Sequence, residues 1–331
     1  MNGTQSGQHR FQSFWHGEAL SPYELFCLKS FIDCGHAVDL YTYQPNLVVP
    51  AGVRVCDAGE LVSQDKVFVY QADGFGKGSP SAFSNLFRYR LLVEKGGWWI
   101  DTDVVCLTGH IPAVSEFFAR QDEDFIACGT IYFAPHHRVM MQCLEQTMKL
   151  GRTVRWGDAG PRLFTRVLKE CGLISRAHPP SVCYPVHYTR ALDLLRPSQT
   201  AALSRQIESS LFLHLYNSTL EFRGVRKMCR PPNGSLLRAC ADKHPVDGWT
   251  GEYDEQTLER ILNSQATMHV HVEENERLRA QLAAIQLHVE ENERLRAQLA
   301  AIQSSTVWRL TAPLRTGGRA FSALRTFGRR R

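Results

Sequence analysis

The sequence lacks several features that would assign a protein to a broad class. None of its apolar runs approaches the roughly 18–20 residues that cross a membrane, so we expect a soluble or peripherally bound protein. Residues 1–10 are polar and do not show the charged-then-apolar order of a secretory signal. This absence predicts a cytoplasmic location.

Paired cysteine motifs and basic stripes are also missing. The ten cysteines are scattered and include no CxxC pair, which predicts free thiols, several of them buried. The formal net charge is only +5, and much of the excess lies in the last 23 residues. No basic stripe with interleaved aromatic residues occurs in the body of the chain, so nucleic acid is not an expected partner.

The features that are present indicate an α/β fold. The 331 residues, 44% of them apolar, are enough for one large α/β domain and an appendage. A predicted strand at residues 11–17 is followed by Ser21-Pro22, with Glu24 three residues after the serine, which is the pattern of a helix-starting capping box. Further predicted strands at 37–43 and 53–56 continue a strand and helix alternation. This alternation predicts a mostly parallel sheet with helices packed on it.

The segment 84–107 carries the clearest chemical signal. Helical spacing of apolar residues up to Leu92 is followed by Gly96-Gly97, which ends the helix, and then by a short apolar strand, Trp98–Ile100. Asp101 and Asp103 come at the carboxyl end of this strand. In an extended chain, residues i and i+2 point to the same side, so the two carboxylates are expected to converge on one hard cation.

The composition changes from about residue 251 onward. The sixteen residues 271–286 recur unaltered as 288–303, with apolar residues at coiled-coil-like spacing. Self-association through residues 265–303 is one interpretation, and a spacer that separates the globular domain from a surface is the other. Residues 304–331 contain seven arginines and no acid, interleaved with apolar residues. They are either a disordered basic end or an amphipathic contact with an anionic membrane.

Four stretches together resemble a known family. SNLFRYRLLVEKGGWWIDTDVVCL is similar to the sugar-binding segment of the DxD-containing glycosyltransferases, a group that includes bacterial capsule and lipooligosaccharide sugar transferases, yeast initiating mannosyltransferases and α-1,4-galactosyltransferases. FQSFWHG, GDAGPRLFTRVLKECG and FLHLYNS resemble other family segments in the same order. The resemblance covers about residues 10–240. It implies a GT-A fold, a nucleotide-sugar donor, a divalent metal and retention of anomeric configuration.

The resemblance also implies roles at the metal. Asp103 would be the direct ligand, with Asp101 nearer the ribose or sharing the metal through water. His214 is either a further ligand, which would favour Mn²⁺ over Mg²⁺, or a buried structural histidine. Trp15 either stacks on the nucleobase or packs in the core.

Three further residues are donor contacts by resemblance. Arg88 occupies the position that touches the donor sugar and diphosphate, where its guanidinium would bind phosphate oxygens. Asn85 stands where the family most often has aspartate, so it brings hydrogen-bonding capacity without a charge. Asp158 is expected to contact donor or acceptor hydroxyls. No catalytic base is expected, because the departing phosphate can take that role in a retaining transferase.

The sequence therefore predicts four parts: a flexible N-terminus at 1–10, a GT-A-like domain at 11–250, a helical coiled-coil-like segment at 251–303 and a basic amphipathic tail at 304–331. The predicted function is transfer of a sugar, with a UDP-sugar the favoured donor, to a glycan or glycolipid in surface polysaccharide or lipopolysaccharide assembly at the inner face of the membrane. Two alternatives stay open. Asp101-Thr102-Asp103 also fits the start of the haloacid-dehalogenase-type phosphatases, with Asp101 as nucleophile, and the helical segment and tail also fit a non-catalytic scaffold.

Overall fold

The computed structural model describes residues 8–71, 76–151, 154–253, 257–261, 263, 285 and 288–304. The chain divides into two compact units, Met1–Ser264 and Gln265–Arg331. Among the described residues, no helix is both long and apolar enough to cross a membrane.

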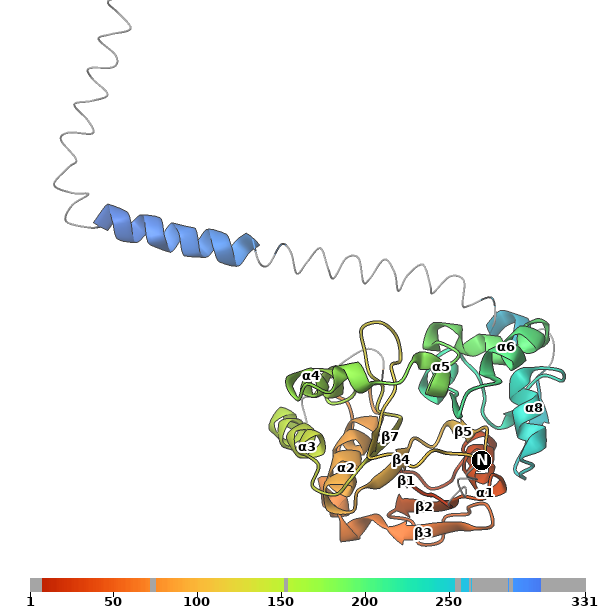
Figure 1. The fold of residues 1–331 in the computed structure, drawn as a ribbon. Coiled ribbons are helices and arrows are strands. Elements are labelled where there is room, and N and C mark those ends of the chain that lie inside the picture. The colour runs from red at the N-terminus through yellow and green to blue at the C-terminus, as the bar shows by residue number, and fades with distance from the viewer. Residues whose placement is uncertain are drawn as a thin grey trace, which may run out of the picture. The chain divides into compact units, whose positions relative to one another are not determined.

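The first unit is built on a mixed sheet of six strands within the described ranges, in the order β3-β2-β1-β4-β7-β6 (Figure 1). The first four strands in this order run parallel, whereas β7 is antiparallel to both of its neighbours, β4 and β6. The predicted α/β fold with a mostly parallel sheet is therefore confirmed. The strands of this sheet are β1 (Arg10–Trp15), β2 (Ala37–Thr42), β3 (Val53–Asp57), β4 (Gly97–Ile100), β6 (Glu116–Phe117) and β7 (Thr130–Phe133).

Helices cover both faces of the sheet. The helix α1 (Pro22–Asp33) begins with the predicted capping box, in which Ser21 and Glu24 satisfy each other's backbone N–H groups. The helix α2 (Ser81–Glu94) ends just before Gly96 and Gly97, which have positive φ values of 62° and 93° and turn the chain into β4. The remaining helices of the described ranges are α3 (Arg138–Leu150), α4 (Pro161–Glu170), α5 (Pro180–Cys183), α6 (Thr200–Ile207), α7 (Asn217–Phe222) and α8 (Leu236–Lys243), with 3₁₀ segments η1 (Ala58–Glu60), η2 (Gln64–Lys66), η4 (Ile174–Arg176), η5 (Tyr188–Leu195) and η6 (Pro197–Gln199).

Side-chain alternation along the strands divides the core in two. Phe11 and Trp98 point to one face and pack with Phe31 of α1. Phe14 and Trp99 point to the other face, where α2, α3 and α4 supply the remaining apolar side chains. The sheet is therefore buried on both sides, as a parallel sheet requires.

Two short strand pairs lie outside the main sheet. The strand β5 (Val104–Cys106) pairs antiparallel with β8 (Phe212–His214), and β9 (Cys229–Arg230) pairs with β10 (Gly251–Glu252). The first of these pairs brings two segments that are distant in the sequence to the carboxyl end of β4.

Part of the second unit can also be described. Residues 288–304, which contain the second copy of the repeat, are helical. The side chains of Val289, Leu295 and Leu299 are 50–52% exposed. Most of the first copy and residues 305–331 lie outside the described residues, so the coiled coil and the basic tail stay predictions from sequence.

Candidate metal and donor site

The two predicted acids lie on a turn between strands of different sheets. β4 ends at Ile100, and the chain turns through Asp101, Thr102 and Asp103 into β5. The predicted strand with both acids at its carboxyl end is confirmed, but the predicted extended conformation of residues 101–103 is wrong, because the chain turns here and β5 leaves the main sheet to pair with β8. The carboxylates still converge, but they do so across a turn and not by the alternation of an extended strand.

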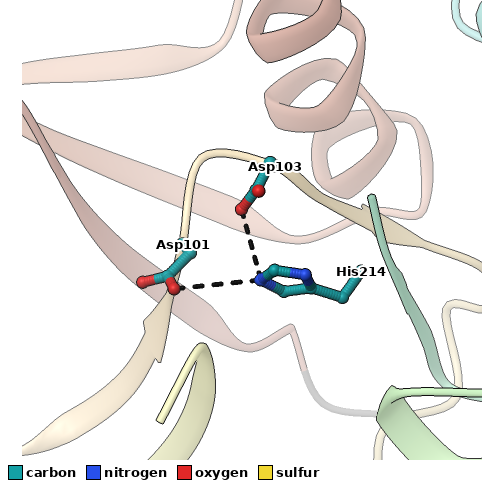
Figure 2. Close-up of side chains that lie close together, drawn as sticks. All are labelled: Asp101, Asp103 and His214. Atoms are coloured by element: carbon teal, nitrogen blue, oxygen red, sulfur yellow. Dashed lines mark ion pairs between the residues drawn. The ribbon is translucent and has the colours of Figure 1, made fainter. Parts of the chain in front are cut away.

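His214 completes a three-residue cluster with these acids. The register of β5 and β8 places His214 opposite Val104, next to Asp103. Its Nε2 lies 3.3 Å from Oδ1 of Asp103 and 3.9 Å from Oδ2 of Asp101 (Figure 2). One potential ligand atom from each of the three residues lies within 4.8 Å of the others.

Gly129 leaves the space around this cluster open. A Cβ on this glycine would lie 3.0 Å from Oδ2 of Asp101 and 3.1 Å from Nε2 of His214. Its carbonyl also accepts a hydrogen bond from the backbone N–H of Asp101. Two ionisable oxygens and one imidazole nitrogen form a donor set that fits Mn²⁺, so the residues present fit the implied metal.

The charges of the cluster are strongly coupled. Burial raises the pKa of Asp103, and the charge of Asp101 adds to this shift while His214 opposes it. For Asp101 burial acts in the same upward direction, but the Arg88 guanidinium, the neighbouring His214 imidazole and the hydrogen bond from Trp99 outweigh it and lower the pKa. Burial works to lower the pKa of His214, but the two carboxylates raise it overall. A cation that replaces the proton on this imidazole would relieve the repulsion between the acids.

Arg88 and Asn85 reach the cluster from α2. Nη2 of Arg88 donates to Oδ1 of Asp101 at 2.7 Å, and Nε1 of Trp99 donates to the same oxygen at 2.8 Å. Nη1 of Arg88 donates to Oδ1 of Asn85 at 2.6 Å. The guanidinium is 96% buried, and its Nε has no hydrogen-bond partner within the described ranges. The structure therefore joins Arg88, Asn85 and Asp101 in one network.

Sequence reasoning missed the residues that hold the other acid. The backbone N–H of Asn217 donates to Oδ2 of Asp103 at 2.8 Å, and the N–H of Leu215 donates to the carbonyl of Asp103. Tyr216, between them, adopts a left-handed conformation with φ of 56°, which is unfavourable for a non-glycine residue. This kink allows the side chain of His214 and the N–H of Asn217 to face the same acid.

Glu24 anchors that kink from the first helix. Its Oε1 accepts a hydrogen bond from Nδ2 of Asn217 at 2.7 Å and another from Nζ of Lys227, and Lys227 also contacts Glu221 at 3.0 Å. The residue is 1% exposed. The capping box accounted for the presence of Glu24 at this position in the sequence. Nothing in the sequence indicated that Glu24 also contacts Asn217.

Trp15 lies at an adjacent groove. This groove has a volume of about 400 Å³ and is lined by Trp15, Ala19, Ser21, Glu24, Glu221, Val225, Arg226, Lys227 and Met228. Nε1 of Trp15 is buried and has no hydrogen-bond partner among the described residues. Trp15 is partly exposed and packs against the core, so core packing is confirmed and stacking on a nucleobase stays a prediction. The groove shares Glu24 with the network that holds Asp103.

Asp158 is not joined to the acids by any hydrogen bond or ion pair within the described part of the chain. Its carboxylate accepts hydrogen bonds from Arg162 and from the backbone N–H of Arg155, both at 3.3 Å. The turn that contains it packs close to Asn85, since a Cβ on Gly160 would lie 3.6 Å from Oδ1 of Asn85. Asp158 thus shapes a turn beside the network.

Comparisons with known proteins agree with the sequence resemblance. Residues 132–244 match the family model of the alpha 1,4-glycosyltransferase conserved region. The chain is 30% identical over 148 residues to an alpha-1,4-N-acetylglucosaminyltransferase of Homo sapiens, a similarity that covers 40% of this chain and 42% of the human protein. The chain therefore spans less than half of the length of that relative.

Two solved structures show a limited similarity. The PaToxG glycosyltransferase has a TM-score of 0.38 and 11% identity, with coverage of 73% of this chain and 87% of that chain. The bifunctional glycosyltransferase WbbM has a TM-score of 0.33 and 12% identity, with coverage of 72% and 53%. The match over 132–244 contains Asn217 and His214, the residues that meet Asp103. The resemblance to the glycosyltransferases that the sequence predicts is therefore supported: residues 132–244 match the conserved region of the alpha 1,4-glycosyltransferases.

Proposed function

We propose that this chain is a metal-dependent, retaining glycosyltransferase that moves a sugar from a nucleotide-sugar donor to a glycan or glycolipid acceptor. The observation that carries the proposal is the convergence of Asp101, Asp103 and His214 beside the buried Arg88. Family membership of residues 132–244 supports the reaction class. The cluster supports the use of a divalent cation, with Mn²⁺ favoured over Mg²⁺ because of the imidazole.

The residues divide the work of binding a glycosyl diphosphate. Asp101, Asp103 and His214 would hold the metal, whose chemistry is to neutralise the charge that develops on the departing diphosphate. The Nε of Arg88 has no hydrogen-bond partner in the described part of the chain, and Asn85 and Asp101 fix its guanidinium, so Arg88 is oriented to bind phosphate or sugar oxygens.

The remaining donor contacts are less direct. The groove beside Trp15 has the volume of a small-molecule site and accommodates the nucleoside, with the indole as its stacking surface. The turn that contains Asp158 packs next to Asn85 and would form one wall of the donor site. We assign no separate catalytic base among the described residues, and the departing phosphate oxygen is expected to take the acceptor proton.

The identity of the sugar is a further proposal. The name of the human relative makes N-acetylglucosamine, carried by UDP, the first donor to test, and α-1,4 the first linkage. The place in surface polysaccharide or lipopolysaccharide assembly, and the cytoplasmic face of the membrane as its location, are supported by the sequence resemblance.

A thermal-shift panel tests the proposal. UDP- and GDP-sugars, with and without Mn²⁺, are added to the full chain, and we expect a rise in melting temperature that needs both the metal and one donor. Asp101→Asn and Asp103→Asn should each abolish this shift and the metal-dependent hydrolysis of that donor. A trapped aspartyl-phosphate analogue without any response to nucleotide sugars would instead favour the phosphatase. Partner binding that survives both substitutions, with no donor response, would favour the scaffold.

The chain outside the transferase domain carries two further proposals. Residues 265–303 form homo-oligomers, and residues 304–331 contact an anionic membrane. The transferase domain is proposed at 11–250, and the first unit continues past it through β10 (Gly251–Glu252) to Ser264. The helical, half-exposed apolar side chains of residues 288–304 support the first of these proposals. Deletion of 265–303 should reduce the molecular mass measured by light scattering to that of a monomer. We expect the full chain to bind anionic but not neutral vesicles, and deletion of 304–331 should abolish the binding to anionic vesicles.

A further inference from the structure

A row of aromatic rings leads from the metal cluster toward solvent. The ring of His214 lies 4.3 Å from that of Tyr216 and 5.7 Å from that of Tyr184. Tyr216 is followed by Tyr188 at 6.2 Å, and Tyr188 by His187 at 4.2 Å. Tyr184 is buried, whereas Tyr188 is 37% exposed. One end of the row therefore lies at His214, a proposed metal ligand, and the other end lies at the protein surface.

A fixed carboxylate lies at the outer end of this row. Asp122 is 3.8 Å from Nε2 of His187, and its side chain is 24% exposed. Its Oδ1 accepts hydrogen bonds from the backbone N–H groups of Asp124 and Phe125 at 2.9 and 2.8 Å. The carboxylate is therefore held in place by the backbone while Oδ2 faces the histidine and Gln121.

The inner end of the row has an unused polar group. The hydroxyl of Tyr216 is buried and has no hydrogen-bond partner among the residues that the structure describes. Buried hydroxyls normally have a partner, so a hydroxyl without one points to a ligand that supplies it. Tyr216 lies two residues after His214, and its backbone N–H donates to Nδ1 of His214 at 3.2 Å. The next residue, Asn217, donates its backbone N–H to Asp103, so Tyr216 is next to the proposed reaction centre.

The row and the Arg88 network lie on different sides of Asp101. Oδ1 of Asp101 faces Arg88 and Trp99, and Oδ2 faces His214, from which the aromatic row extends. The first side contains the basic group suited to a diphosphate. The second side contains aromatic faces, the hydroxyls of three tyrosines and a carboxylate, and the row includes no arginine or lysine.

We propose that Tyr188, His187, Asp122 and Tyr216 form the subsite for the acceptor, and that the acceptor residue it binds is a pyranose sugar. This inference rests on the proposed function. A pyranose is amphipathic: its C–H groups pack on the negative face of an aromatic ring, and its hydroxyls donate to a carboxylate. Tyr188 and His187 supply the rings, Oδ2 of Asp122 accepts from one sugar hydroxyl, and the Tyr216 hydroxyl bonds the sugar nearest the metal. The subsite thus assigns the acceptor to the glycans rather than to protein side chains.

Saturation-transfer NMR on the full chain tests this subsite. The probes are the methyl α- and β-pyranosides of galactose, glucose, N-acetylglucosamine and N-acetylgalactosamine, each with saturating UDP and Mn²⁺. We expect at least one pyranoside to bind, and Tyr188→Ala and Asp122→Asn each to weaken it at least 10-fold while the affinity for UDP with Mn²⁺ changes less than twofold. Tyr188→Leu repeats the test if the alanine variant has a lower melting temperature.

The matched controls are a carboxylate on η5 and an exposed ring elsewhere. Asp193→Asn removes an acid that contacts Arg190 and Arg196, and Phe222→Ala removes a ring that is 57% exposed. Both should bind the pyranoside as the unaltered protein does. Binding of no pyranoside, or unchanged binding by Tyr188→Ala and Asp122→Asn, overturns the subsite. Failure of the unaltered protein to bind either UDP or GDP with Mn²⁺ overturns the proposed function itself, so the two failures are distinguishable.

Discussion

The substitution Asn217→Ala tests how the structure positions Asp103, one of the two carboxylates proposed to bind the metal. The substitution removes the hydrogen bond from Nδ2 of Asn217 to Oε1 of Glu24 but keeps the backbone N–H that reaches Asp103. Glu24 keeps Lys227 and the capping box as partners. The change therefore separates the anchor from the acid without leaving a buried charge unpaired.

The magnitude follows from the left-handed residue next to it. A hydrogen bond to a charged group contributes about 1.5–3 kcal/mol, and a non-glycine residue in a left-handed conformation costs about 1–3 kcal/mol. The stabilisation from this hydrogen bond and the cost of the left-handed conformation are of similar size. Without the bond between Asn217 and Glu24, we therefore expect Tyr216 to leave the left-handed conformation. Loss of such an outer partner typically weakens metal binding by about 10- to 100-fold. We expect the same loss of Mn²⁺ affinity here, about 1.4–2.7 kcal/mol.

Isothermal titration of the folded variant with Mn²⁺ measures this loss. Glu221→Gln is the matched control, because the Glu221 side chain also contacts Lys227 but, within the described ranges, makes no hydrogen bond or ion pair with Tyr216 or Asn217. The control should bind Mn²⁺ as the unaltered protein does. If Asn217→Ala binds Mn²⁺ within twofold of the unaltered protein while it stays folded, the reasoning that Glu24 maintains the geometry of Asp103 is refuted.

Three other outcomes can be checked independently. Gly129→Ala should weaken Mn²⁺ binding by at least 10-fold in the same titration, because its Cβ would crowd Asp101 and His214; unchanged affinity would contradict the open space. Phe87→Ala should lower the free energy of unfolding by about 3–5 kcal/mol in urea melts, because this ring is fully buried. The hydrogen bond with Cys106 lowers the pKa of Cys34 to about 7 against the opposing effect of burial, so the thiolate fraction rises as pH passes upward through that value. The rate of alkylation of Cys34 by iodoacetamide, followed by peptide mapping, should therefore have its midpoint near pH 7, and a midpoint at or above the ordinary thiol pKa of about 8.5 would contradict this assignment.

Local patterns predicted the elements that depend on local physics. The capping box at Ser21 and the glycine pair at 96–97 fix where a helix begins and where one ends, and both are present in the structure. The strand and helix alternation was sufficient for the parallel sheet. The acids and His214 were found because the residue types and their order resemble a family, and the structure brings them within reach of each other.

The sequence did not reveal contacts that depend on tertiary pairing. Val104 and Val105 begin a second short apolar stretch after the two acids, and nothing in that stretch indicated that β5 pairs outside the main sheet. Glu24 already had a complete local explanation, and its partner Asn217 lies 193 positions away. The aromatic row likewise joins residues from several separate elements, so it exists only after the chain has folded.

The pairing of β5 with β8 has a consequence for the order of folding. The parallel strands β1 to β4 come from residues 10–100 and can associate early, whereas the cluster needs β8, which arrives more than a hundred residues later. A cation that binds the closed cluster but not the open chain would stabilise only the fully assembled protein, by about 2.7 kcal/mol at 100 times its dissociation constant. If β8 docks late in folding, Mn²⁺ would slow unfolding more than it speeds folding. It would also stabilise the complete fold over an intermediate in which the main sheet has formed but β8 has not yet paired with β5.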